Sequence, residues 1–67
     1  MATREQAILN ARQRAQRRAQ AYYAIQAKNG QWMCERAEFV EGPVGRMAYP
    51  PARQRVKFSY TGEQMES

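Results

Sequence analysis

The sequence predicts an α+β fold in which one N-terminal helix packs on a three-stranded antiparallel sheet. The prediction depends on an alanine- and arginine-rich segment with helical spacing, a strong hairpin signal and a later stretch of strict alternation. All of it belongs to one small domain covering 1–67. The expected bounds are a helix over 3–21, a hairpin over 22–40, a loop over 41–52, a strand over 53–60 and a frayed tail over 61–67.

The predicted helix has a start signal and one narrow apolar side. Thr3 followed by Gln6 matches a capping box, in which the threonine oxygen accepts a free backbone N–H and the glutamine side chain reaches back. Glu5 lies in the first turn, where the helix dipole favours negative charge. At 100° per residue the apolar stripe is mostly alanine, so the helix can lie close to whatever it covers. The stripe consists of Ile8, Ala11, Ala15, Ala19 and Tyr22.

The hairpin signal is Asn29-Gly30, because both central residues of a type I′ turn need positive φ. A two-residue loop at this pair would place Ile25 opposite Cys34 and Ala27 opposite Trp32. Beyond Arg36 the apolar residues shift to odd-numbered positions, Ala37 and Phe39, so we expect a bulge near 35–37. The predicted apolar face consists of Tyr23, Ile25, Ala27, Trp32 and Cys34.

A rival interpretation extends the first helix to Lys28, uses Asn29-Gly30 as its C-cap and starts a second helix at Trp32. The sheet interpretation is favoured over it. Residues 53–60 alternate cleanly, with apolar side chains on one side and Arg55, Lys57 and Ser59 on the other, so this third strand should join the hairpin. The core expected from it consists of Ile8, Ala15, Ala19, Tyr23, Ile25, Trp32, Cys34, Val56 and Phe58.

Composition restricts the function. The 67 residues include one cysteine and no histidine, so an internal disulfide, a histidine-bearing metal site and a cysteine-rich zinc site are all excluded. The free thiol suggests a reducing, cytoplasmic compartment. No apolar run is long enough for a membrane span, and a secretory signal is not expected. We expect no cofactor, no membrane partner and no small-molecule substrate.

The net charge of +5 comes from the first segment, because residues 1–28 carry six positive and one negative side chains and the remainder carries five of each. Arg14, Arg17 and Arg18 share one arc of the helix, with no acid three or four residues away to relieve their repulsion. Arg12 adds to this set. Guanidinium groups suit phosphate, although a charged helix face can also be merely solvated.

Residues 10–20 resemble the arginine-rich helical peptides of phage antitermination proteins. The resemblance rests on arginine and alanine alone, and the folded remainder of this chain departs from that family. The candidate residues of this segment for contact with nucleic acid or another anionic partner are Arg12, Arg14, Arg17 and Arg18.

A second basic row, Arg53, Arg55 and Lys57, follows the outward face of the last strand. These cations can protect an edge strand from pairing with other chains, or extend a phosphate track if they share a surface with the helix. The sequence leaves both interpretations open. It does contain aromatic and methionine residues without a core role, which are candidates for a protein interface: Tyr22, Phe39, Met47 and Tyr49.

The sequence lacks a positioned acid, base or nucleophile, so we do not expect an enzyme. The leading hypothesis is a small binding protein that contacts nucleic acid or a nucleoprotein complex through the arginine-rich helix. The alternative is a small inhibitor or adaptor of the kind encoded by phages and mobile elements, similar in size and character to anti-CRISPR proteins, acting through protein contacts. Homodimerisation is compatible with both.

Overall fold

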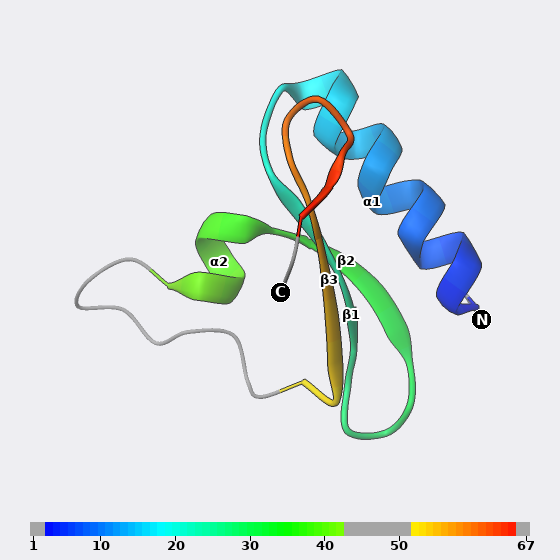
Figure 1. Ribbon diagram of the computed structural model, residues 1–67. Helices are drawn as coiled ribbons and strands as arrows, with labels where there is room; N and C mark the ends of the chain where they lie inside the picture. Colours follow the sequence, from blue (N-terminus) through cyan, green and yellow to red (C-terminus); the bar gives the residue numbers. More distant parts are fainter. Residues whose placement is uncertain (1–2, 43–51, 66–67) are drawn as a thin grey trace.

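A helix lies across one face of an antiparallel sheet, and a second, short helix lies on the other face (Figure 1). The computed structural model describes residues 3–42 and 52–65. Within them the sheet has four strands in the order β2-β1-β3-β4. The predicted fold class is confirmed, although the sheet has one strand more than expected. The elements are α1 (Arg4–Arg18), β1 (Tyr22–Gln26), β2 (Trp32–Arg36), α2 (Ala37–Glu41), β3 (Gln54–Phe58) and β4 (Gln64–Met65).

Helix α1 begins as predicted and ends three residues early. The Thr3 side chain accepts a hydrogen bond from the backbone N–H of Gln6 at 3.1 Å. The Gln6 side chain donates to Asn10 instead of returning to Thr3, so the capping box is only half formed. Ala19 then adopts the left-handed conformation, with φ 53° and ψ 45°, and its N–H bonds the carbonyl oxygen of Ala15. Its side chain is exposed, so its placement in the predicted core was wrong.

The β1–β2 turn has three residues, and this shifts the pairing by one. Ala27 donates to the carbonyl of Gln31 at 2.8 Å, and the Gly30 N–H bonds the carbonyl of Ala27 at 2.9 Å. Gly30 has a φ of 90°, whereas Asn29 does not have positive φ. The turn is therefore the three-residue type, with glycine in the left-handed position, in place of the predicted type I′. As a result Ala24 pairs with Cys34, where Ile25 was expected.

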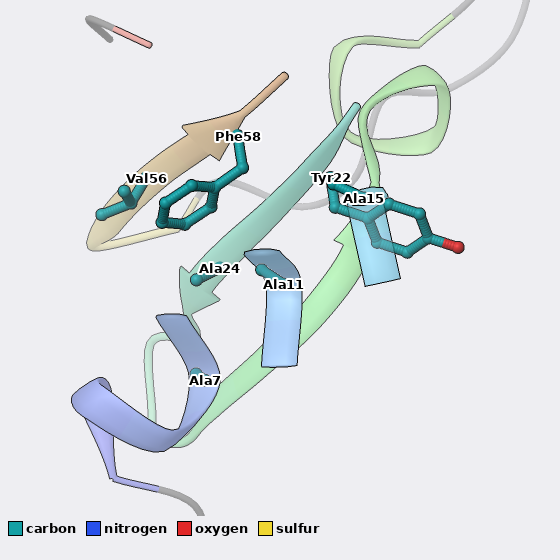
Figure 2. Close-up of a cluster of buried hydrophobic side chains, with 7 residues drawn as sticks. All are labelled: Ala7, Ala11, Ala15, Tyr22, Ala24, Val56 and Phe58. Atoms are coloured by element: carbon teal, nitrogen blue, oxygen red, sulfur yellow. The ribbon is translucent and has the colours of Figure 1, made fainter. Parts of the chain in front are cut away.

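The one-residue shift changes which side chains face α1. Ala24 shares a buried cluster with Val56 and Phe58 on the α1 face (Figure 2). Tyr23 and Ile25 point the other way and form a second cluster under α2. Strand β1 is therefore buried on both faces, which the prediction of a single apolar face did not allow. Trp32 and Cys34 do lie against the α1 cluster, and Ile8 is partly buried there.

Two further predictions about the chain between β2 and β4 were wrong. No bulge forms near 35–37, because β2 ends at Arg36 and α2 begins at Ala37. Residues 64 and 65 form β4, where a frayed tail was expected, and they pair with Lys57 and Phe58. The rival two-helix interpretation was also wrong, because both segments flanking Gly30 are strands. Most of the predicted loop over 41–52 lies outside the described residues.

Close packing between α1 and the sheet depends on alanine. Ala7, Ala11 and Ala15 recur every four residues, and each has 0% exposed area. They face Ala24, also 0% exposed, and the rings of Tyr22 and Phe58 close the cluster (Figure 2). Small side chains on both elements let the two backbones approach, so no space remains for a larger residue.

We expect Ala11→Leu to destabilise the protein by about 1–3 kcal/mol, because added methylenes force strain into a filled core. Gln13→Leu, on the exposed side of the same helix, is the matched control and should change stability by less than about 0.5 kcal/mol. Urea unfolding followed by circular dichroism measures both. Equal stability of the two variants would contradict the packing described here.

Because Ala19 ends α1 in the left-handed conformation, replacing alanine with glycine should change stability in opposite directions at Ala19 and at Ala15. Ala19→Gly should stabilise the protein by about 0.5–1 kcal/mol, because glycine adopts positive φ without the penalty that an L side chain carries. Ala15→Gly, four residues earlier in the helix interior, should destabilise it by about 1 kcal/mol. The free energy of unfolding from urea titration distinguishes the two signs. A loss of stability in Ala19→Gly would show that helix α1 continues past Arg18.

Candidate nucleic-acid interface

Arg14, Arg17 and Arg18 are exposed and lie together on the side of α1 above β2. Burial raises the pKa of the Cys34 thiol in β2, and the charge of Arg14 opposes that rise, so Arg14 lies near this strand. Residues three and four positions further along a helix fall on the same side. The prediction that these three arginines share one arc is therefore consistent with the structure of α1.

Arg12 lies on the opposite side of the helix from Arg14. Its guanidinium carbon is 5.4 Å from the ring centroid of Phe58 in β3. At the N-terminal end, Arg4 lies 5.9 Å from the ring centroid of Trp32 in β2. Cationic side chains therefore follow both long edges of α1, and those of Arg4 and Arg12 lie over aromatic rings of the sheet below.

The arginines of α1 have no acidic partner among the described residues. The two ion pairs there join Arg36 to Glu38 at 3.4 Å and Lys57 to Glu41 at 2.5 Å. Arg18 instead donates to the hydroxyl of Tyr22 at 3.0 Å. It lies with Arg17 in the last turn of α1, where the helix dipole favours positive charge. This placement offsets part of the mutual repulsion and leaves the charge itself unneutralised.

The second basic row lies on the other face of the sheet. In β3 the side chains alternate, and Val56 and Phe58 face α1, so Arg55 and Lys57 face away from it. Arg55 lies 5.8 Å from the ring centroid of Tyr23, which belongs to the cluster under α2. Arg53 is exposed just before the strand. The two basic rows therefore do not form one continuous track.

Glu41 of α2 neutralises part of that second row. It accepts hydrogen bonds from the Lys57 ammonium at 2.5 Å and from the Tyr23 hydroxyl at 2.8 Å. The bond from Lys57 and then that from Tyr23 hold the pKa of Glu41 below its ordinary value. The hydrogen bond between Lys57 and Glu41 also raises the pKa of Lys57. Burial, followed by the hydrogen bond to Glu41, raises the pKa of Tyr23.

The structure describes two of the four predicted interface candidates, Tyr22 and Phe39. Tyr22 is buried, with 3% of its area exposed, so it is a core residue. Phe39 of α2 is 39% exposed, and Arg36 lies over its ring at 4.7 Å. Met47 and Tyr49 lie outside the described residues.

Tyr60 is the residue that the sequence analysis missed. It lies in the turn between β3 and β4 and is 63% exposed. The turn touches α1, because the Gln16 side chain donates to the carbonyl of Thr61 at 3.1 Å. A signal was present: Gly62 follows Ser59 by three residues, as Gly30 follows Ala27, and a glycine-containing loop after an alternating strand indicates a hairpin.

Neither a metal site nor a membrane span is evident in the part of the chain that the structure describes. No three histidine, cysteine, aspartate or glutamate side chains gather there to hold an ion. None of its helices has the length and apolar character needed to cross a bilayer. Cys34 uses its thiol as a donor to the carbonyl of Ala7 at 3.2 Å.

No protein-family model, curated protein or solved structure matches this chain.

The Glu41 contacts predict an acid-dependent contribution to stability. A carboxyl whose pKa is lowered by folding stabilises the protein above its unfolded pKa of about 4.3, and this stabilisation is lost as the pH falls through the folded-state value. The wild-type protein should therefore be more stable than Glu41→Gln at pH 7, and the difference should shrink below about pH 4.

Urea unfolding of both proteins from pH 7 to pH 3 measures this difference. Glu63→Gln removes the same charge from an exposed turn residue and is the matched control. Parallel stability curves for the wild type and Glu41→Gln would contradict the role given to Glu41.

Proposed function

We propose that this chain is a non-catalytic binding protein that contacts nucleic acid, alone or within a nucleoprotein complex, through α1. The observation that carries the proposal is the distribution of charge. The arginines of α1 are exposed and lack acidic partners among the described residues, whereas the cations on the other face share it with glutamates. Unneutralised guanidinium groups on one helix complement a phosphate backbone.

The acidic side chains support this assignment by their position. Among the described residues, α1 contributes one acid, Glu5, in its first turn. Glu35 faces away from α1 by strand alternation, and Glu38 and Glu41 belong to α2. The fifth described acid, Glu63, lies in the turn between β3 and β4. Helix α1 itself therefore carries five arginines against one acid, a surplus of positive charge that can attract a polyanion.

A second candidate function, inhibition of a host complex through protein contacts, is favoured by exposed apolar side chains on several elements. These are Leu9 at 46%, Phe39 at 39% and Met65 at 42% exposed. They lie on three different elements, α1, α2 and β4 respectively. The nucleic-acid proposal is preferred because its residues belong to one helix.

The test compares two triple variants that lose the same charge. Arg14→Gln, Arg17→Gln and Arg18→Gln together should weaken binding to single-stranded RNA and duplex DNA. They should also reduce the log–log salt slope by about two to three units, since three phosphate contacts are lost. Lys28→Gln, Arg53→Gln and Arg55→Gln together lower the net charge equally away from α1 and should retain most of the affinity.

Fluorescence anisotropy of labelled nucleic acid at two salt concentrations measures affinity and slope, and thermal unfolding checks that both triple variants fold. Equal losses of affinity in the two triple variants would show that net charge alone, and not the position of the arginines on α1, determines binding. If the wild type binds no polyanion at low salt, the nucleic-acid proposal fails and the protein-partner candidate replaces it.

A further inference from the structure

The turn between β3 and β4 presents an aromatic ring beside the arginine-rich helix. Tyr60, at 63%, is more exposed than Leu9, Phe39 or Met65, the other large apolar side chains exposed among the described residues. In Figure 1 this turn lies at the C-terminal end of α1. The hydrogen bond from Gln16 to the carbonyl of Thr61, 3.1 Å long, shows that the two segments are in contact.

The turn that carries Tyr60 is fixed by its own hydrogen bonds. The Ser59 N–H bonds the carbonyl of Glu63 at 2.9 Å, and the Gly62 N–H bonds the carbonyl of Ser59 at 2.8 Å. The hydroxyls of Ser59 and Thr61 lie 2.8 Å apart and share a further hydrogen bond. A turn ordered in this way loses little backbone freedom when its exposed side chain binds a ligand, so less of the contact energy is spent on ordering the chain.

The turn is also packed closely against α1. Gly62 has a φ of 87°, and a Cβ atom on it would lie 2.6 Å from the Gln16 side-chain nitrogen. Arg12 lies one helical turn before Gln16 and rests over Phe58, two residues before Tyr60. An exposed cation and an exposed ring therefore lie along the same edge of α1.

Among the aromatic residues that the structure describes, Tyr60 is the one that is neither buried nor covered by a cation. Tyr22, Tyr23 and Phe58 are buried. The rings of Trp32 and Phe39 each lie under an arginine. In the described part of the chain, the Tyr60 ring has neither a cation over it nor a hydrogen bond.

We propose that Tyr60 stacks on an unpaired base, so that the ligand of α1 is single-stranded nucleic acid. This inference rests on the proposed function of the helix. In single-strand binding proteins an exposed aromatic ring stacks on a base while neighbouring cations contact the backbone. A paired base in a duplex does not offer its face, so the ring adds affinity for a single strand and none for a duplex. Stacking is indifferent to base identity, so little sequence preference is expected.

The test uses Tyr60→Ala with a labelled mixed-sequence single strand and the duplex of the same sequence. Single-strand affinity should fall about 5- to 100-fold, the range found for loss of one base–aromatic stack. Duplex affinity should change less than about twofold, and the salt slope should stay the same, because no phosphate contact is lost. Tyr60→Trp should retain single-strand binding. Met65→Ala, which removes another exposed apolar side chain, is the matched control.

The outcomes separate this inference from the function on which it rests. If the wild type binds and the arginine triple variant does not, but Tyr60→Ala binds single strands like the wild type, the stacking role is wrong and the helix interface stands. Equal losses on single strand and duplex would also overturn it. If the wild type binds neither nucleic acid, both proposals fail. Because Tyr60 is exposed, thermal unfolding should be unchanged in Tyr60→Ala.

Discussion

The close approach of α1 to β1 is the constraint on which the rest of the structure depends. Ala7, Ala11 and Ala15 bring the helix backbone down onto Ala24, and larger rings seal the edges of that contact. This arrangement leaves the other face of β1 to be covered separately, which α2 does through Ala37 and Val40. A five-residue strand buried on both faces is then held by packing from two sides and by hydrogen bonds to β2 and β3.

The sequence was sufficient for the fold class, because each main element carries a local signal. The helix follows from its alanine spacing and its Thr3 cap, and β3 from its strict alternation. The hairpin was predicted in the right place with the wrong register. Asn29-Gly30 suits a type I′ turn and also a three-residue turn whose last residue is a left-handed glycine, and in both Gly30 has positive φ. Local chemistry does not separate the two; burial of Ala24 under α1 requires the second.

In the candidate site, as in the fold, features set by neighbouring residues in the chain were predicted, and features set by contacts between distant segments were not. Helical spacing alone placed Arg14, Arg17 and Arg18 on one arc. Whether the two basic rows share a surface depends on which face of β3 packs against α1. The alternation of polar and apolar residues along a strand does not determine this. The structure pairs Glu41 with Lys57 and the Tyr23 hydroxyl, contacts between segments far apart in the chain that local spacing does not predict. Tyr60 was missed because the strand was expected to run to residue 60 with this ring on its apolar side, whereas β3 ends at Phe58 and Gly62 marks a second turn of the same kind as Gly30.

The sheet separates two surfaces of different electrostatic character, and this separation bears on how a ligand would approach. Glu35, Glu38 and Glu41 lie on the α2 side with Arg55 and Lys57, so charges of both signs meet there. Helix α1 itself has five arginines and one acid, Glu5, at its N-terminal end, and Glu63 lies in the adjoining β3–β4 turn. A charge distribution of this kind orients a molecule in the field of a polyanion before contact. The face so presented carries the arginines of α1 and, at its C-terminal end, the turn with Tyr60. When a polyanion attracts the protein, the face that turns toward it is therefore the face that also carries the exposed ring of Tyr60.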